Sequence, residues 1–169
     1  MRMTEGLPVT RTSSSWIVLK FGGTSVSSLA NWKNIASVVK ARRAMGARVL
    51  VVHSALSGVT DRLEKLLAAA LQGEHEAVLA DIRERHRRLC EDLGIPVGPA
   101  LERHFSELAQ IAAGVALIGE VSDRLRARVM ATGELMSADI GARYLQSQGI
   151  EAVWADARAM LKAEERRGA

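Results

Sequence analysis

Two short apolar runs, at residues 16–19 and 49–52, stand on either side of a stretch with helical periodicity. Runs that are continuously apolar and rich in Val, Ile and Leu are typical of strands buried in a parallel sheet. Between them, apolar residues recur at helical spacing from Leu29 to Val39, and Gly46 closes the segment. A strand–helix–strand unit implies a right-handed crossover and a parallel strand pair. The sequence therefore predicts an α/β fold.

Helical periodicity dominates the chain after the second predicted strand. We expect one helix to end near Gly73, a second to stop at residues 94–96, and a third to carry the apolar positions of residues 101–115. A long helix follows from Asp123 to Gln148, and Ile150 to Trp154 is a candidate third strand. The predicted fold is a mainly parallel sheet with a helix-rich insertion between strands two and three.

The two ends of the chain lack apolar periodicity. Residues 1–15 are expected to form a flexible leader, residues 16–161 the folded domain and residues 162–169 a frayed end. No apolar run reaches the roughly 18 residues of a membrane span, and no secretory signal is recognisable. We therefore expect a cytoplasmic protein with no membrane association.

The net charge of +4 raises the question of a nucleic-acid partner. Basic residues alternate with Asp and Glu, and the densest cluster, at residues 83–88, has no aromatic side chain on which a base could stack. We predict a solvated surface of mixed charge and no nucleic-acid partner. The single cysteine, Cys90, can form neither an internal disulfide nor a zinc site with other thiols.

Polar residues follow the first predicted strand at its carboxyl end, where open α/β sheets bind ligands. This segment contains Lys20, Phe21, Gly22 and Gly23. Adjacent glycines let backbone N–H groups approach phosphate oxygens, and a lysine ammonium offsets their charge. The chain has neither a P-loop nor a G-x-G-x-x-G motif, so on spacing alone a simple turn is the favoured interpretation of the glycines and phosphate binding is the alternative.

The second predicted strand is followed by hydroxyl side chains at the entry to a helix. Such hydroxyls cap helices or hold a carboxylate. We expect Ser57 to be the helix N-cap, whereas Ser54 and Thr60 could do either. His53 belongs to the apolar run and is expected to be a packed histidine without a catalytic role.

The long predicted helix carries a glycine in its interior, Gly133, at a cost of about 1 kcal/mol relative to alanine. Either another backbone packs closely there, which is the favoured interpretation, or the glycine leaves room for a ligand beside Glu134. A carboxylate at that place could pair with a substrate amine.

Several motifs together resemble one family. Residues 20–26, with the sequence KFGGTSV, resemble the segment with which aspartate kinases open their amino-acid-kinase domain. Residues 51–60 resemble the second strand and substrate loop of that family, and residues 133–137 its glycine–glutamate segment. Residues 156–158 also fit, and the resemblance extends over residues 16–161, nearly the whole chain.

The resemblance implies a three-layer α/β/α amino-acid-kinase fold, of which this chain would be the amino-terminal portion. It also implies ATP-dependent phosphorylation of the side-chain carboxylate of L-aspartate to 4-phospho-L-aspartate, the first step towards lysine, threonine and methionine. The implied cofactors are ATP and the Mg²⁺ bound through it, and the implied assembly is a homo-oligomer.

The family's functional residues map onto matching positions of this sequence. Lys20 would be catalytic, by neutralising charge on the transferred phosphoryl group. The resemblance assigns ATP binding to Lys20, Phe21, Gly22 and Gly23, aspartate binding to Ser54, Thr60 and Glu134, and no residue to metal binding. For Asp156 and Arg158 it leaves open whether they touch ligand or brace a turn.

The 169 residues contain no segment resembling the family's adenine pocket or regulatory domains. We therefore expect the missing kinase half as a partner and no turnover by this chain alone. One alternative is another kinase of the superfamily, acting on glutamate, acetylglutamate or a nucleoside monophosphate, against which the Thr24-Ser25-Val26 ending argues. The other is a non-catalytic module that binds aspartate or a partner subunit.

Overall fold

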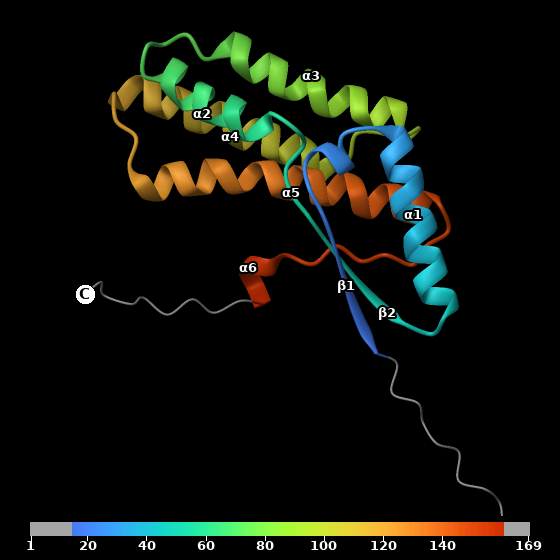
Figure 1. Cartoon of the computed structure of the whole chain (residues 1–169). Helices are drawn as coiled ribbons and strands as arrows, with labels where there is room; N and C mark the ends of the chain where they lie inside the picture. The colour runs from blue at the N-terminus through green and yellow to red at the C-terminus, as the bar shows by residue number, and fades with distance from the viewer. Residues whose placement is uncertain (1–14, 161–169) are drawn as a thin grey trace, which may run out of the picture.

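The computed structural model describes residues 15–160. Predictions for residues 1–14 and 161–169 lie outside this part of the chain. Figure 1 shows the described elements, which are β1 (Trp16–Phe21), η1 (Thr24–Val26), α1 (Leu29–Ala44), β2 (Arg48–His53), α2 (Val59–Ala70), α3 (Glu76–Asp92), α4 (Pro99–Ile118), α5 (Asp123–Ser147) and α6 (Ala157–Met160).

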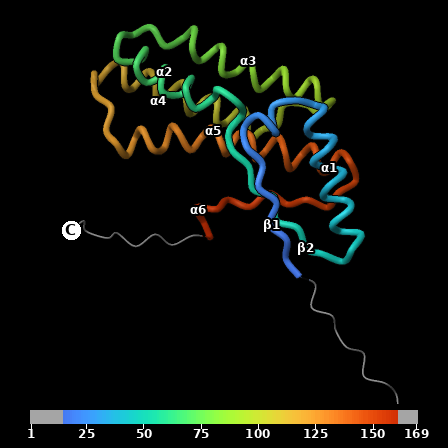
Figure 2. Tube along the Cα trace, in the orientation of Figure 1, coloured from blue at the N-terminus to red at the C-terminus, as the bar shows by residue number. Residues whose placement is uncertain are grey.

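The predicted strand–helix–strand unit is confirmed. β1 and β2 pair in parallel, in a register from Trp16 opposite Arg48 to Phe21 opposite His53. Figure 2 follows the chain from β1 through α1 and back into β2, so that both strands run in the same direction. Among the described residues the sheet consists of these two strands. The carboxyl ends of both strands thus lie together, next to the helices.

Helices α2 to α5 form the main core, which Figure 1 shows as a bundle from which the strand pair extends. The periodic apolar positions predicted for α2, α3 and α4 are buried, including Leu63, Ile82 and Phe105. Met136 is buried on α5. Burying a side chain of this size stabilises the fold by about 1.5–3 kcal/mol. The long helix, predicted to span Asp123 to Gln148, ends one residue earlier, at Ser147.

Trp32 joins α1 to this core. The indole is fully buried, its Nε1–H donates to the carbonyl of Val26 at 2.8 Å, and its ring meets Tyr144 of α5 edge to face at 5.8 Å between centroids. A buried tryptophan needs such a partner for its N–H. The contact holds the turn after β1, through Val26, against the helical layer.

The prediction that the two strands are buried on both faces is wrong for the described part of the chain. Burial alternates along each strand, and the exposed fractions of Trp16 and Val18 are 60% and 61%. Leu50 and Val52 are exposed on β2 as well. The physical reason is that the described helices pack on one face of the strand pair, whereas a three-layer sandwich covers both.

The predicted third strand, Ile150 to Trp154, is not formed in the structure. The N–H of Ala152 donates to the carbonyl of Ile150 at 2.8 Å, and the Ala152 carbonyl accepts from the side chain of Gln146. Groups that a sheet ladder would use are therefore bonded locally. Val153, with an exposed fraction of 90%, is the most exposed large apolar residue of this segment.

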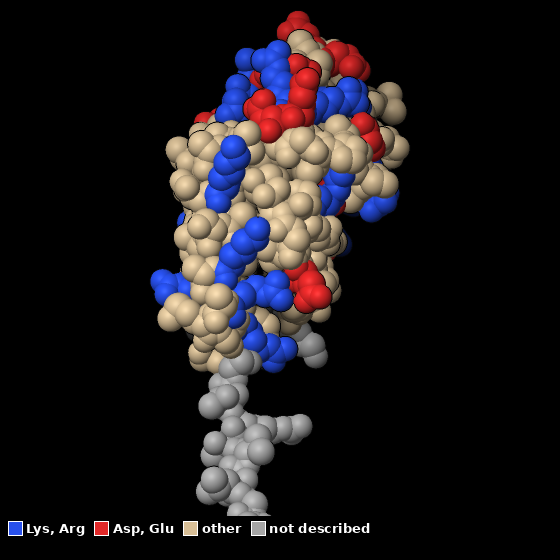
Figure 3. All heavy atoms as spheres, turned by 90° about the vertical axis from the view of Figure 1, so that its right-hand side faces the viewer, with Lys and Arg blue, Asp and Glu red and all other residues tan. Residues whose placement is uncertain are grey.

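The predicted mixed-charge surface is confirmed. Figure 3 shows acidic and basic side chains side by side at the top of the molecule. Ion pairs connect the helices, for example Arg87 on α3 to Glu102 on α4 and Arg128 on α5 to Glu107 on α4. None of the helices within residues 15–160 combines the length and apolar character needed to cross a membrane.

Candidate functional site

The loop after β1 presents free backbone donors at the carboxyl end of the strand. The carbonyls of Gly22 and Gly23 accept from the N–H groups of Ser25 and Val26, which closes the short helix η1. The N–H groups of Gly22, Gly23 and Thr24 have no acceptor among residues 15–160. A Cβ added at Gly22 would meet no atom within 4 Å, so the space beside it is open. Three successive N–H groups without an acceptor in this part of the chain, with open space beside the first of them, suit an anion such as a phosphate group.

Lys20 and Phe21 lie immediately before these donors and point to opposite faces of β1. Lys20 is exposed, on the same face as Trp16 and Val18. Phe21 is half-buried, its side chain packs against the core, and its carbonyl accepts from the N–H of Ser54. The ammonium of Lys20 is therefore free to reach a charged group near the loop.

The loop after β2 connects the strand to α2. The N–H of Ser54 donates to the carbonyl of Phe21 at 3.2 Å, which extends the strand pairing by one residue. Ser54 is half-buried and Thr60, in the first turn of α2, is exposed. The two hydroxyls therefore stand at either end of a short turn beside the end of β1.

The prediction that Ser57 caps α2 is wrong. The N-cap is Gly58, whose φ of +73° lies in the left-handed region that favours glycine. The turn closes through a hydrogen bond from the N–H of Val59 to the carbonyl of Leu56 at 2.9 Å. The N–H of Ser57 instead donates to the hydroxyl of Ser27, on the loop after β1.

The two loops touch through glycine. A Cβ at Gly23 would lie 2.8 Å from the carbonyl oxygen of Ala55 and 3.3 Å from the nitrogen of Ser57. Ser27 bridges the same contact, because its hydroxyl donates to the carbonyl of Gly23 at 2.6 Å and accepts from the Ser57 N–H at 2.9 Å. Gly23 is therefore required by this close approach of the two loops.

Helix α5 completes the arrangement at Gly133. A Cβ there would lie 2.9 Å from the Cβ of Ala55 and 3.2 Å from a methyl carbon of Leu63. The interpretation of Gly133 as a close-packing residue is thus confirmed, although side chains and not a backbone make the contact. Glu134, the next residue, is exposed. Ala55 is consequently the point where the loop after β1, the loop after β2 and α5 meet.

His53 is packed, as predicted. Its Nδ1 lies 3.1 Å from the hydroxyl of Ser137, and its ring meets Trp32 edge to face at 5.5 Å. Burial lowers the pKa of His53, against a smaller opposing effect of the Ser54 carbonyl. A Cβ at Gly141 would lie 2.9 Å from Nε2 of the same ring.

Sequence reasoning missed the contacts of His53 with α5, although a signal for them exists. Small residues recur every four positions along the helix, at Gly133, Ser137 and Gly141, and all three are buried. Residues spaced by four share one face of a helix. This small-residue face seats both the turn that contains Ala55 and the side chain of His53.

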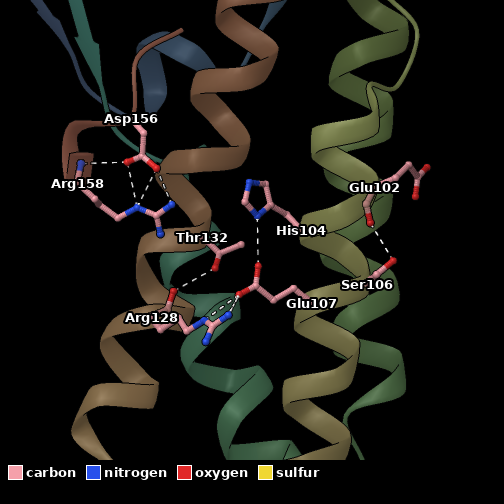
Figure 4. Close-up of polar contacts among 8 residues, drawn as sticks. All are labelled: Glu102, His104, Ser106, Glu107, Arg128, Thr132, Asp156 and Arg158. Atoms are coloured by element: carbon pink, nitrogen blue, oxygen red, sulfur yellow. Dashed lines mark hydrogen bonds and ion pairs between the residues drawn. The ribbon is translucent and has the colours of Figure 1, made fainter. Parts of the chain in front are cut away.

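Asp156 and Arg158 pair with each other. Nε and Nη2 of Arg158 donate to the Asp156 carboxylate at 2.7–3.1 Å, as Figure 4 shows. Hydrogen bonds from the Arg158 side chain hold the pKa of the Asp156 carboxyl below its usual value. The backbone N–H of Arg158 also donates to the Asp156 carboxylate, so the pair closes the start of α6.

Metal-ligating side chains are not clustered in the part of the chain that the structure describes. Residues 15–160 bring together no group of three or more His, Cys, Asp or Glu side chains that could hold a metal ion.

Comparison with known proteins identifies a family model and several relatives that match most of this chain. The model of the amino acid kinase family matches residues 15–168. An aspartokinase of Chlamydia muridarum is 30% identical over 145 residues, which are 86% of this chain and 31% of that protein. A chloroplastic bifunctional aspartokinase/homoserine dehydrogenase 1 of Arabidopsis thaliana is 32% identical over 154 residues, or 87% of this chain and 17% of that protein.

Solved structures agree with these relatives. The crystal structure of E. coli aspartokinase III in complex with aspartate and ADP (R-state) matches with a TM-score of 0.69 and 29% identity, over 82% of this chain and 30% of that one. The same enzyme in complex with lysine and aspartate (T-state) gives a TM-score of 0.67 at 30% identity, over 81% and 30% of the two chains. The chain thus spans less than a third of these relatives.

Proposed function

This chain belongs to the amino acid kinase family, and on that premise we propose that it forms the aspartate-binding side of an aspartate kinase active site. The reaction is the ATP-dependent phosphorylation of the side-chain carboxylate of L-aspartate, which yields 4-phospho-L-aspartate and ADP. The observation that carries the proposal is the meeting of three segments around Ala55, which are the loop after β1 with its N–H donors, the loop after β2 with its hydroxyls, and α5 at Gly133, the residue before Glu134.

The phosphoryl group is assigned to the loop after β1. ATP, with Mg²⁺ on its phosphates, supplies that group when bound. In this proposal Lys20 and the N–H groups of Gly22 and Gly23 stabilise the negative charge on its oxygens. The exposure of Lys20 and the lack of an acceptor for these N–H groups among residues 15–160 support the assignment. Phe21 holds the start of this loop in place, because its side chain packs against the core and its carbonyl accepts from the Ser54 N–H. Phosphoryl transfer depends mainly on such positioning and charge stabilisation.

The amino acid is assigned to the neighbouring segments. Ser54 and Thr60 donate hydrogen bonds from their hydroxyls that orient the aspartate, and Glu134 pairs with its α-ammonium group. The attacking side-chain carboxylate is already ionised at neutral pH, so the step needs no general base. Its oxygen forms the new P–O bond while the bond between the transferred phosphorus and the leaving ADP oxygen breaks.

Catalysis by the 169-residue chain alone is not expected. The chain spans 31% of the Chlamydia muridarum aspartokinase and 34% of the E. coli lysine-sensitive aspartokinase 3. The described residues that we assign hold the phosphoryl group and the amino acid, and none is assigned to the adenine. We propose that the remainder of a longer, oligomeric kinase supplies that part of the site.

Calorimetric titration of this chain with L-aspartate tests the assignment. We expect saturable binding that Glu134→Gln weakens by about tenfold or more, because the substitution removes the charge that faces the ammonium group. Glu91→Gln, an exposed carboxylate on α3, is the control and leaves the affinity unchanged. Phosphorylation of acetylglutamate but not of aspartate by the native gene product would refute the substrate.

A further inference from the structure

Two arginines from neighbouring helices hold consecutive carbonyls of the turn that separates Ser54 from Thr60. A guanidinium nitrogen of Arg85, on α3, donates to the carbonyl of Ser57 at 2.6 Å. Nη1 of Arg62, on α2, donates to the carbonyl of Gly58 at 2.9 Å. Both hydrogen bonds come from a charged donor, which makes them stronger than bonds between neutral groups.

Helix α3 supports both arginine contacts. Arg85 acts directly, and Asp81 acts through Arg62, whose Nε donates to the Asp81 carboxylate at 2.5 Å. Asp81 and Arg85 are four residues apart and therefore share one face of the helix. Both arginines are half-buried, so their side chains have less freedom than those of fully exposed arginines.

The turn is held from its other side by Ser27. The N–H of Ser57 donates to the Ser27 hydroxyl at 2.9 Å while its carbonyl accepts from Arg85. One peptide segment is thus fixed by the loop after β1 and by α3. A surface depression between them is lined by Ser27 and Leu56 on one side and by α3 residues, Arg85 among them, on the other.

We propose that Arg85 is a positioning residue of the site. Through the carbonyl of Ser57, it sets the distance between the loop after β2, which carries the hydroxyls, and the loop after β1, to which the phosphoryl group is assigned. The proposal rests on the proposed function for its ligand. Arg85 touches no reacting atom in this role. The Asp81–Arg62 pair helps to hold the same turn through the carbonyl of Gly58. Helix α3 therefore contributes to the active site without lining it.

The test compares this chain with its Arg85→Ala, Arg85→Lys and Arg88→Ala variants. Arg88 is the matched control, because it lies on the same helix and, among residues 15–160, forms its ion pair only with Glu84 of that helix. Three properties are measured, which are the amide hydrogen exchange of residues 54–59, the dissociation constant for L-aspartate and the melting temperature.

In Arg85→Ala we expect amide exchange in the turn to become about fivefold faster and the dissociation constant for L-aspartate to rise by a similar factor. This is the effect expected when one partly solvated hydrogen bond from a charged donor is lost. Lysine at position 85 restores part of both, since an ammonium can also donate to the Ser57 carbonyl, and Arg88→Ala changes neither. The melting temperatures of all variants stay close together.

Unchanged exchange in the turn of Arg85→Ala overturns the proposal, as does a loss of aspartate affinity that Arg88→Ala reproduces. A wild-type chain that binds no aspartate refutes the proposed function, whereas the exchange data still decide whether Arg85 holds the turn. The two failures are therefore distinguishable.

Discussion

Gly23→Ala tests the contact between the two loops. The new Cβ would lie 2.8 Å from the carbonyl oxygen of Ala55 and 3.3 Å from the nitrogen of Ser57. Both are backbone atoms, so no side-chain rotation relieves the overlap, and forcing a methyl group into such a place costs about 1–3 kcal/mol. The backbone of Gly23 is right-handed helical, with φ −56° and ψ −40°, which alanine adopts without strain.

The helical backbone at Gly23 adds an opposing effect. Alanine loses less conformational entropy on folding than glycine, which stabilises such a variant by roughly 0.4–1 kcal/mol. The difference leaves Gly23→Ala destabilised by about 1–2 kcal/mol, or a decrease in melting temperature of about 2–8 °C for a chain of this size. We expect L-aspartate binding to weaken as well, since the loops must move apart.

Thermal and urea unfolding, followed by circular dichroism, provide the measurement. Gly22→Ala is the control, because a Cβ at Gly22 meets no atom within 4 Å and its stability stays near that of the wild type. Equal stability of Gly23→Ala and the wild type, or an equal loss in both variants, would show that the two loops are not in the contact described.

Three further predictions concern the core and the loop bridge, which is the pair of hydrogen bonds that Ser27 makes to Gly23 and Ser57. Gly133→Ala destabilises the chain by about 1 kcal/mol in urea, because the overlap with Ala55 outweighs the gain in helix propensity; a stabilised variant would contradict this packing. Burial lowers the pKa of His86 to about 4, so stability that is full above pH 6.5 falls as the pH drops towards 4, and melting temperatures of His86→Leu measured over this range lose part of that dependence. Ser27→Ala removes both hydrogen bonds of the loop bridge and lowers the unfolding free energy by about 1 kcal/mol, with faster exchange at Ser57; unchanged exchange there would exclude the bridge.

The sequence allowed the local part of the fold to be predicted. Helix positions depend on apolar periodicity within one segment, which is why α5 was placed to within a residue of its end. The prediction of a third strand was wrong because a strand needs a neighbouring strand to pair with. In the described chain the N–H of Ala152 donates to the carbonyl of Ile150 and not to another strand. Ser57 looked like an N-cap on composition alone, but Gly58 takes the left-handed conformation at the start of α2.

The candidate site also has a part that follows from consecutive residues and a part that depends on contacts between distant segments. Lys20, Gly22 and Gly23 follow a strand directly, so the phosphate loop was visible in consecutive residues. The contacts of Ser57 with Ser27 and Arg85 span 30 and 28 residues of sequence and depend on how α3 packs. No local pattern encodes such contacts, and the structure was needed to find them.

The small-residue face of α5 also determines where this chain can change its length. Each residue of a helix advances the chain by 1.5 Å and turns it by about 100°. One residue inserted between Ser122 and Gly133 would therefore rotate Glu134 and the small-residue face away from Ala55 and His53. A longer or shorter connection at residues 119–122, between α4 and α5, leaves that register intact. Between α4 and Gly133, insertions and deletions that preserve function are thus confined to the connection, while the first half of α5 keeps a constant residue count.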